Sequence, residues 1–107
     1  MSNKILYNVT VKIIKEKAED WIQWMSENHI PDVMNTGKFL SYRMTEIYDD
    51  ESEDDGRSFA IQYVAPDMET FQDYQSNFAK SLQEEHATRY ANQYVAFRTL
   101  MQILKES

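Results

Sequence analysis

Side chains that could carry proton transfer are few in this sequence, and the two histidines come first among them. Imidazole changes its charge near neutral pH, which suits it to acid–base work and to ligand contacts. His29 comes two residues before Pro31, where the sequence predicts a joint between two helical turns. There it could serve as a proton carrier near the mouth of a cavity. The simpler interpretation, which we favour, is a partly exposed histidine that caps helix carbonyl groups.

His86 lies on the apolar stripe of a predicted helix, and we interpret it as a histidine at the edge of the core, near the end of that helix. The two histidines do not form a metal motif, because the sequence contains neither His-x-x-x-His nor His-Glu-x-x-His and offers no evident third ligand. The sequence therefore predicts no metal site and no other cofactor.

Two arginines are the candidates for anion binding. We expect Arg43 and Arg98 to project from a sheet face that no helix covers. Their guanidinium groups could bind a ligand carboxylate, or an Asp or Glu of a second copy of the chain. We favour the second partner, because arginine is enriched at interfaces. Asn8, Thr10 and Gln62 share this predicted face and could either complete a polar pocket or form hydrogen bonds across a dimer.

Composition excludes several other chemistries. The chain has no cysteine, which excludes thiol catalysis, disulfides and zinc bound by cysteine. Its two glycines, Gly37 and Gly56, cannot form a phosphate loop or a dinucleotide-binding turn. The acidic run at 49–55 fails as a calcium loop, since Glu51 would be its first residue and Gln62 its twelfth. We expect that run to form a solvated hairpin tip.

The net charge of −7 would repel phosphate backbones and anionic lipid headgroups. We therefore expect neither nucleic-acid binding nor membrane binding. The segment 57–61 loosely echoes a strand of RNA-recognition motifs, but the acidic charge and an aliphatic Ile61 argue against that function. Polar residues interrupt the apolar run at the N-terminus, as no signal peptide would, so the expected location is the cytoplasm.

Two periodicities of apolar residues in the sequence predict the strands and helices that hold these side chains. Alternating apolar and polar residues predict four strands, at residues 4–14, 38–48, 57–65 and 93–104. In the last of them we expect Val95, Phe97, Met101 and Ile103 to face the core, with Tyr94, Arg98, Leu100 and Gln102 on the opposite face.

Apolar residues at helical spacing predict two long helices. The first covers residues 17–28 and should be interrupted at Pro31, after which a short turn at 32–35 is closed by Gly37. The second begins after Asp67, a plausible N-cap. The resulting order, β-α-β-β-α-β, predicts an α+β fold of the ferredoxin-like type, with both helices on one face of a four-stranded antiparallel sheet. We expect residues 1–107 to form a single such domain and to pair as a homodimer through the uncovered sheet face or through the edges of the sheet.

Six segments of the chain are distinctive in combination: 5–11, 21–25, 29–33, 61–63, 85–86 and 94–100. They resemble domain-of-unknown-function family 4286, a family of small uncharacterised bacterial proteins. The resemblance extends over nearly the whole chain, and it implies a relation to the dimeric α+β barrel superfamily. That superfamily includes cofactor-free monooxygenases, isomerases and haem-degrading enzymes, so it implies a fold but neither an activity nor catalytic residues.

Three functions remain open on this basis. The first is a dimeric protein that binds a small molecule or a protein partner without catalysis. The second is a cofactor-free enzyme, similar to a monooxygenase or isomerase, with its site between sheet and helices. In that enzyme His29 would carry the proton, and Arg43 or Arg98 would hold an anionic substrate. The third is an adaptor whose acidic surface binds a basic protein.

Overall fold

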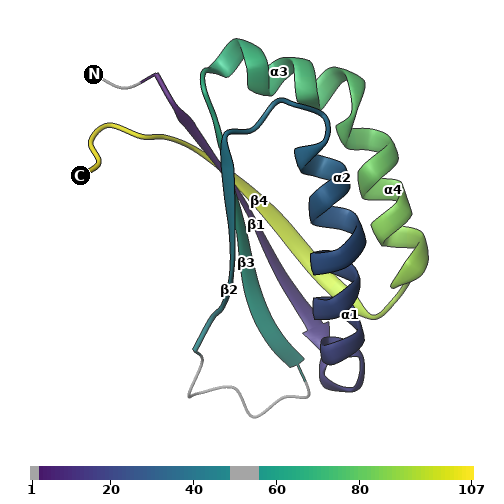
Figure 1. The fold of residues 1–107 in the computed structure, drawn as a ribbon. Coiled ribbons are helices and arrows are strands. Elements are labelled where there is room, and N and C mark those ends of the chain that lie inside the picture. Colours follow the sequence, from purple (N-terminus) through teal and green to yellow (C-terminus); the bar gives the residue numbers. More distant parts are fainter. Residues whose placement is uncertain (1–2, 49–55) are drawn as a thin grey trace.

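Four antiparallel strands form one sheet, and every helix lies on the same face of it (Figure 1). This computed structural model describes residues 3–48 and 56–107. The strands are β1 (Ile5–Ile14), β2 (Ser41–Glu46), β3 (Gly56–Ala65) and β4 (Tyr94–Gln102), and their order in the sheet is β2-β3-β1-β4. This arrangement confirms the predicted ferredoxin-like fold. The expected hairpin tip at 49–55 lies outside the described residues.

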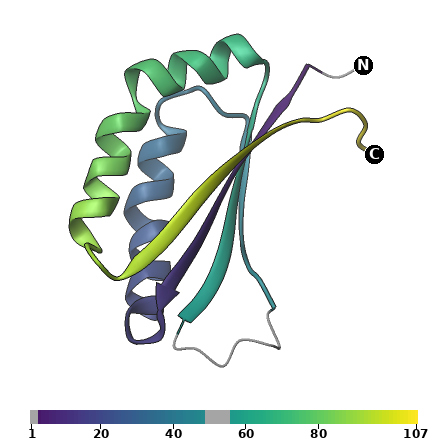
Figure 2. The ribbon, with the colours of Figure 1, turned by 180° about the vertical axis from the view of Figure 1, so that it is seen from behind.

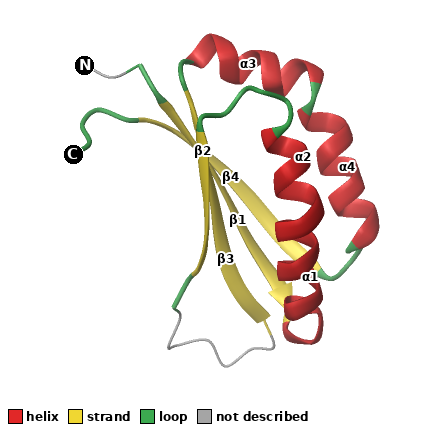
Figure 3. Ribbon diagram, viewed as in Figure 1, coloured by secondary structure: helices red, strands yellow, loops and turns green. Residues whose placement is uncertain are grey.

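The helical layer has two arms, which Figure 3 shows in red. The first arm consists of η1 (Lys15–Lys17), α1 (Ala18–Trp24), the π-helical turn η2 (Met25–His29) and α2 (Ile30–Met34). The second arm consists of α3 (Met68–Asn77) and α4 (Ala79–Arg89), which meet at Phe78, a residue with non-helical backbone angles. Within the described ranges, no helix has the length and apolar character needed to span a bilayer.

Pro31 does not interrupt the first arm, so the expected break there is wrong. Pro31 is the second residue of α2. A backbone N–H in the first turn of a helix has no carbonyl partner within that helix, so proline, which lacks this N–H, is tolerated there. The π-helical turn absorbs the change of register, because the Ile30 amide bonds to the Met25 carbonyl. The helix therefore continues past His29 and holds that residue over the sheet. The arm ends before Gly37, which adopts a left-handed φ of 76°.

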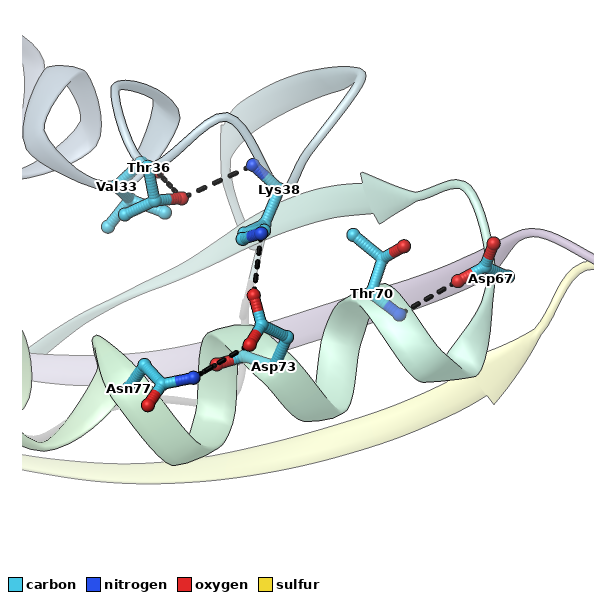
Figure 4. A network of polar contacts seen from close by, with 7 residues as sticks. All are labelled: Val33, Thr36, Lys38, Asp67, Thr70, Asp73 and Asn77. Atoms are coloured by element: carbon cyan, nitrogen blue, oxygen red, sulfur yellow. Dashed lines mark hydrogen bonds and ion pairs between the residues drawn. The ribbon is translucent and has the colours of Figure 1, made fainter.

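Asp67 caps α3 as predicted, since its carboxylate accepts a 2.8 Å hydrogen bond from the Thr70 amide (Figure 4). The same figure shows Lys38, in the connection before β2, paired with Asp73 of α3. This ion pair links the connection after α2 to the middle of α3.

Asp67→Ala is expected to lower the free energy of unfolding by about 1 kcal/mol, because one amide at the start of α3 loses its acceptor. Urea denaturation of the two proteins would measure the loss. Asp67→Asn is the control, since the asparagine side chain also accepts this bond and should retain most of the stability. Equal losses in both variants would contradict the assigned cap.

The core lies between the helices and the facing side of the sheet. Trp21, Ile13 and Ile61 have no exposed surface, and Tyr7 and Tyr63 are nearly as buried. Aromatic rings surround Tyr7, whose ring centre is 5.0 Å from that of Phe71. Burial of this apolar area is the main source of stability for the fold.

The prediction for the faces of β4 is inverted. Arg98 lies opposite Val9, and Tyr94 lies opposite Ile13, so both face the helices. Val95 and Phe97 point to the uncovered face and are 68% and 63% exposed. Figure 2 shows β4 from behind with no helix in front of it. The strand carries its more apolar residues on the uncovered side, which is why its alternation alone indicated the wrong face.

Candidate functional site

A small cavity lies between the helical layer and the sheet. Its volume is about 30 Å³, which leaves room only for water-sized groups. Its lining is Tyr7, Val9, Val11, Met25, His29, Val33, Ile61, Tyr63, Tyr74, Gln83, His86, Ala96 and Arg98. We call this space the inner cavity. It is mostly apolar, and two imidazoles, one guanidinium and one amide are its strongest polar groups.

A second space adjoins the inner cavity and has a volume of about 210 Å³. This outer groove runs along β4 under the second helical arm. It is lined by Tyr7, Phe71, Tyr74, Gln75, Ala79, Gln83, Arg98, Thr99 and Leu100. Tyr7, Tyr74, Gln83 and Arg98 line both spaces, so they form the boundary between them. A ligand in the groove would pass these four residues to reach the cavity.

His29 is placed at the cavity by the π-helical turn. Its Nδ1 atom is buried and has no hydrogen-bond partner among the described residues. The ring centre lies 5.3 Å from that of Trp24 and 5.8 Å from that of His86. The His29 pKa is lowered to about 4, chiefly by burial, with Asp32 opposing the shift and Arg98 adding to it. His29 is therefore a neutral imidazole at pH 7.

His86 is fixed by a hydrogen bond across the core. The indole Nε1–H of Trp21 donates to His86 Nε2 at 2.9 Å. Since an indole N–H can only donate, the Nε2 atom must be unprotonated and the neutral ring carries its proton on Nδ1. Burial lowers the His86 pKa to about 4, with smaller contributions from His29 and Arg98. Trp21 thus determines which hydrogen-bonding group His86 can present.

Arg98 supplies the positive charge at the boundary of the two spaces. In the part of the chain that the structure describes, no Asp or Glu carboxylate forms an ion pair with its guanidinium group. The residue is exposed to solvent. Burial raises the pKa of the neighbouring Tyr7 hydroxyl, while Arg98 and Gln83 both act to lower that pKa. The hydroxyl stays protonated at neutral pH, so Arg98 is the cation available to an anionic group entering the groove.

The six candidate residues from the sequence fall into two groups. His29 and Arg98 meet at the inner cavity. The other four, Asn8, Thr10, Arg43 and Gln62, lie on the uncovered face, where Gln62 is the strand partner of both Asn8 and Arg43. There the Asn8 amide donates to the Thr10 hydroxyl at 2.9 Å. The expectation that Arg98 shares the uncovered face with Arg43 is thus wrong, because the register of β4 places Arg98 on the helix side.

Tyr7 and Gln83 line both spaces, but the sequence did not mark either of them as functional. Tyr7 was assigned only to the core, and Gln83 flanks the apolar stripe of the second arm. Trp21 and His86 are 65 positions apart, and their hydrogen bond had no sequence signal. The sequence signal that could have indicated this site was the polar Gln83 next to the apolar stripe of the second arm. No group of three His, Cys, Asp or Glu within 3–48 and 56–107 is arranged to hold a metal ion.

Comparison with models of protein families shows to which family the chain belongs. The model of the family described as "Domain of unknown function (DUF4286)" matches residues 4–104. The protein belongs to this family. The sequence-based resemblance is thereby confirmed, and the DUF4286 match extends over both helical arms and all four strands. A comparison with curated proteins found no match for this DUF4286 protein.

Solved structures with the same fold cover almost the whole DUF4286 chain. SnoaB, a cofactor-independent oxygenase from Streptomyces nogalater, has a TM-score of 0.69 at 12% identity and covers 98% of this chain and 97% of its own. A putative antibiotic biosynthesis monooxygenase from Bacillus cereus has a TM-score of 0.68 at 6% identity, with 99% and 98% covered.

A third similar structure is a dimeric ferredoxin-like protein from an uncultured marine organism. Its TM-score is 0.66 at 12% identity, with 97% of this chain and 98% of that chain covered. Identities this low show a shared fold only, since one fold supports many functions.

Proposed function

We propose that this protein binds a small organic anion between its helices and its sheet. The observation that carries the proposal is that Arg98 and His29 line one cavity. No carboxylate of the described residues pairs with Arg98, and the buried His29 Nδ1 atom has no hydrogen-bond partner among them. A guanidinium recognises carboxylate or phenolate oxygens with directional hydrogen bonds. The outer groove is smaller than the roughly 300–1,000 Å³ sites of drug-sized ligands, which favours a molecule of about one ring.

Arg98→Gln is expected to weaken binding of such anions about tenfold or more, because a charge-assisted hydrogen bond is lost. The measurement is thermal stabilisation by a panel of small organic acids, followed by calorimetry on the compounds that bind. A ligand at a hundred times its Kd stabilises by about 2.7 kcal/mol, which such a screen detects readily.

Arg43→Gln is the matched control, because it removes the same charge from the uncovered face. It should leave the affinity unchanged. Equal losses in both variants, or equal binding of the corresponding neutral amides, would contradict an anion site at Arg98.

A cofactor-free enzyme is the second candidate. His29 is a neutral base inside the cavity, and one of the structural neighbours, SnoaB, is a cofactor-independent oxygenase. However, a pKa of about 4 makes this imidazole a weak base for a neutral substrate. Binding therefore has stronger support than catalysis. Oxygen consumption in the presence of each bound acid, lost in His29→Gln, would favour the enzyme.

The homodimer is part of the proposal. Val95, Phe97 and Met101 expose apolar surface on the uncovered face, where a protein in water gains by covering it. Among the described residues of the four strands, this face contains no Asp or Glu. The dimeric neighbour is consistent with pairing of two sheets. The acidic adaptor and the cytoplasmic location stay predictions.

A further inference from the structure

We propose that the His29–His86 pair recognises a hydroxyl group of the ligand, with His86 donating to the oxygen and His29 accepting from it. The inference deepens the proposed function and rests on it. It names the second recognition point of the ligand, in the inner cavity that Arg98 also lines.

The direction of the hydrogen bonds follows from Trp21. Because its indole N–H occupies His86 Nε2 at 2.9 Å, the only proton that a neutral His86 can offer is on Nδ1. Trp21 is a positioning residue in this arrangement, since it does not contact the ligand and acts on it only by fixing the tautomer of His86. Among the residues described, no side chain or carbonyl takes up the His86 Nδ1 proton. His86 lines the inner cavity, where a ligand oxygen could accept that proton.

His29 provides the opposite polarity. Its buried Nδ1 is the one buried side-chain nitrogen or oxygen in the described residues that lacks a partner. An unsatisfied buried polar atom costs about 1–3 kcal/mol, so a ligand group that satisfies it gains affinity. A neutral imidazole nitrogen can accept a hydrogen bond from a hydroxyl donor.

The spacing of the two rings suits one bridging oxygen atom. Their centres are 5.8 Å apart, while each hydrogen bond from a ring nitrogen to oxygen spans about 2.7–3.2 Å. The inner cavity, at about 30 Å³, admits a hydroxyl but no ring. The ring would occupy the outer groove, beside Phe71 and Tyr74. Hydroxyl groups both donate and accept, which neither a methyl group nor a carboxylate can do.

The tautomer is tested first, by long-range proton–nitrogen NMR of the histidine rings at pH 7. In the wild-type protein we expect His86 to carry its proton on Nδ1. Trp21→Phe should abolish this preference. Trp24→Phe is the matched control, because Trp24 also contacts His86, with ring centres 5.8 Å apart, but makes no hydrogen bond to it. An Nε2 proton on wild-type His86 would overturn the inference without any variant.

Phenol and toluene then test the recognition itself, because they differ only in a hydroxyl and a methyl of similar size. We expect phenol to bind about tenfold more tightly, as two neutral hydrogen bonds are gained. The advantage should fall to about twofold or less in Trp21→Phe and persist in Trp24→Phe.

Equal affinities for phenol and toluene would overturn the inference, and so would phenol binding that Trp21→Phe leaves intact. Equal affinities would mean that the two rings do not select a hydroxyl over a methyl group. Organic acids that still depend on Arg98 in that case would leave the proposed function standing. If no organic acid binds but phenol binds as expected, the proposed anion site at Arg98 is rejected and the proposed hydroxyl site at the two histidines stands.

Discussion

Phe97→Asp is expected to convert a dimer of this protein into a monomer. Phe97 is 63% exposed and lies beside Val95, which is 68% exposed, on the uncovered face. A carboxylate placed among these apolar side chains would lose its water when the two copies pair, and an unpaired buried charge costs several kcal/mol per copy. The loss in dimer affinity should therefore exceed a thousandfold, about 4 kcal/mol. Analytical ultracentrifugation over a range of concentrations would measure it.

Tyr48→Asp serves as the control for that experiment. Tyr48 is 95% exposed and lies beyond the end of β2, so the same charge introduced there should leave the dimer intact. Far-ultraviolet circular dichroism would show whether both variants keep the fold. A wild-type protein that sediments as a monomer at every concentration would contradict the proposed interface, as would a dimer that survives Phe97→Asp.

Acidification from pH 7 to pH 5 is expected to lower the free energy of unfolding by about 2–4 kcal/mol. Burial holds the pKa values of His29 and His86 at about 4 in the folded protein, against an ordinary value of 6.5. Between these two values the unfolded chain binds protons that the folded protein does not. Stability is therefore complete above pH 6.5, falls as the pH drops through this window, and levels off near pH 4. Urea denaturation at fixed protein concentration would measure the loss.

His29→Gln and His86→Gln should each remove about half of that pH dependence. Glutamine at position 86 can still accept a hydrogen bond from Trp21, which limits the damage to the core. The window above pH 5 isolates the histidines, because the carboxylates with lowered pKa values, such as Asp67 and Asp73, lose their contribution at lower pH. A curve that is flat from pH 7 to pH 5 in the wild-type protein would contradict buried neutral imidazoles.

Most of the fold was predictable because local pattern and global arrangement agree in it. Alternation located all four strands, and helical spacing located both arms. The faces of β1, β2 and β3 followed from the position of their apolar residues. The prediction of the two faces failed for β4, because Phe97 and Val95 make its uncovered face the more apolar one. A pattern in one chain does not tell a face buried by its own helices from one that another molecule would cover.

The site was only partly predictable. Sequence reasoning named His29 and Arg98 as candidates but placed Arg98 on the other side of the sheet. Pro31 suggested a break in the helix, and the π-helical turn before it, which positions His29, has no simple sequence signal. The bond between Trp21 and His86 depends on the packing of two helical arms, so no spacing along the chain could reveal it.

The placement of β4 has one further consequence. Consecutive residues of this edge strand serve two different surfaces: Arg98 lines the ligand space and Phe97 belongs to the proposed interface. If ligand binding or dimer formation restricts the motion of this strand, the other event has a smaller entropic cost. Thermodynamic linkage then requires reciprocity, so an occupied groove should tighten the association of subunits by the same factor by which association tightens ligand binding.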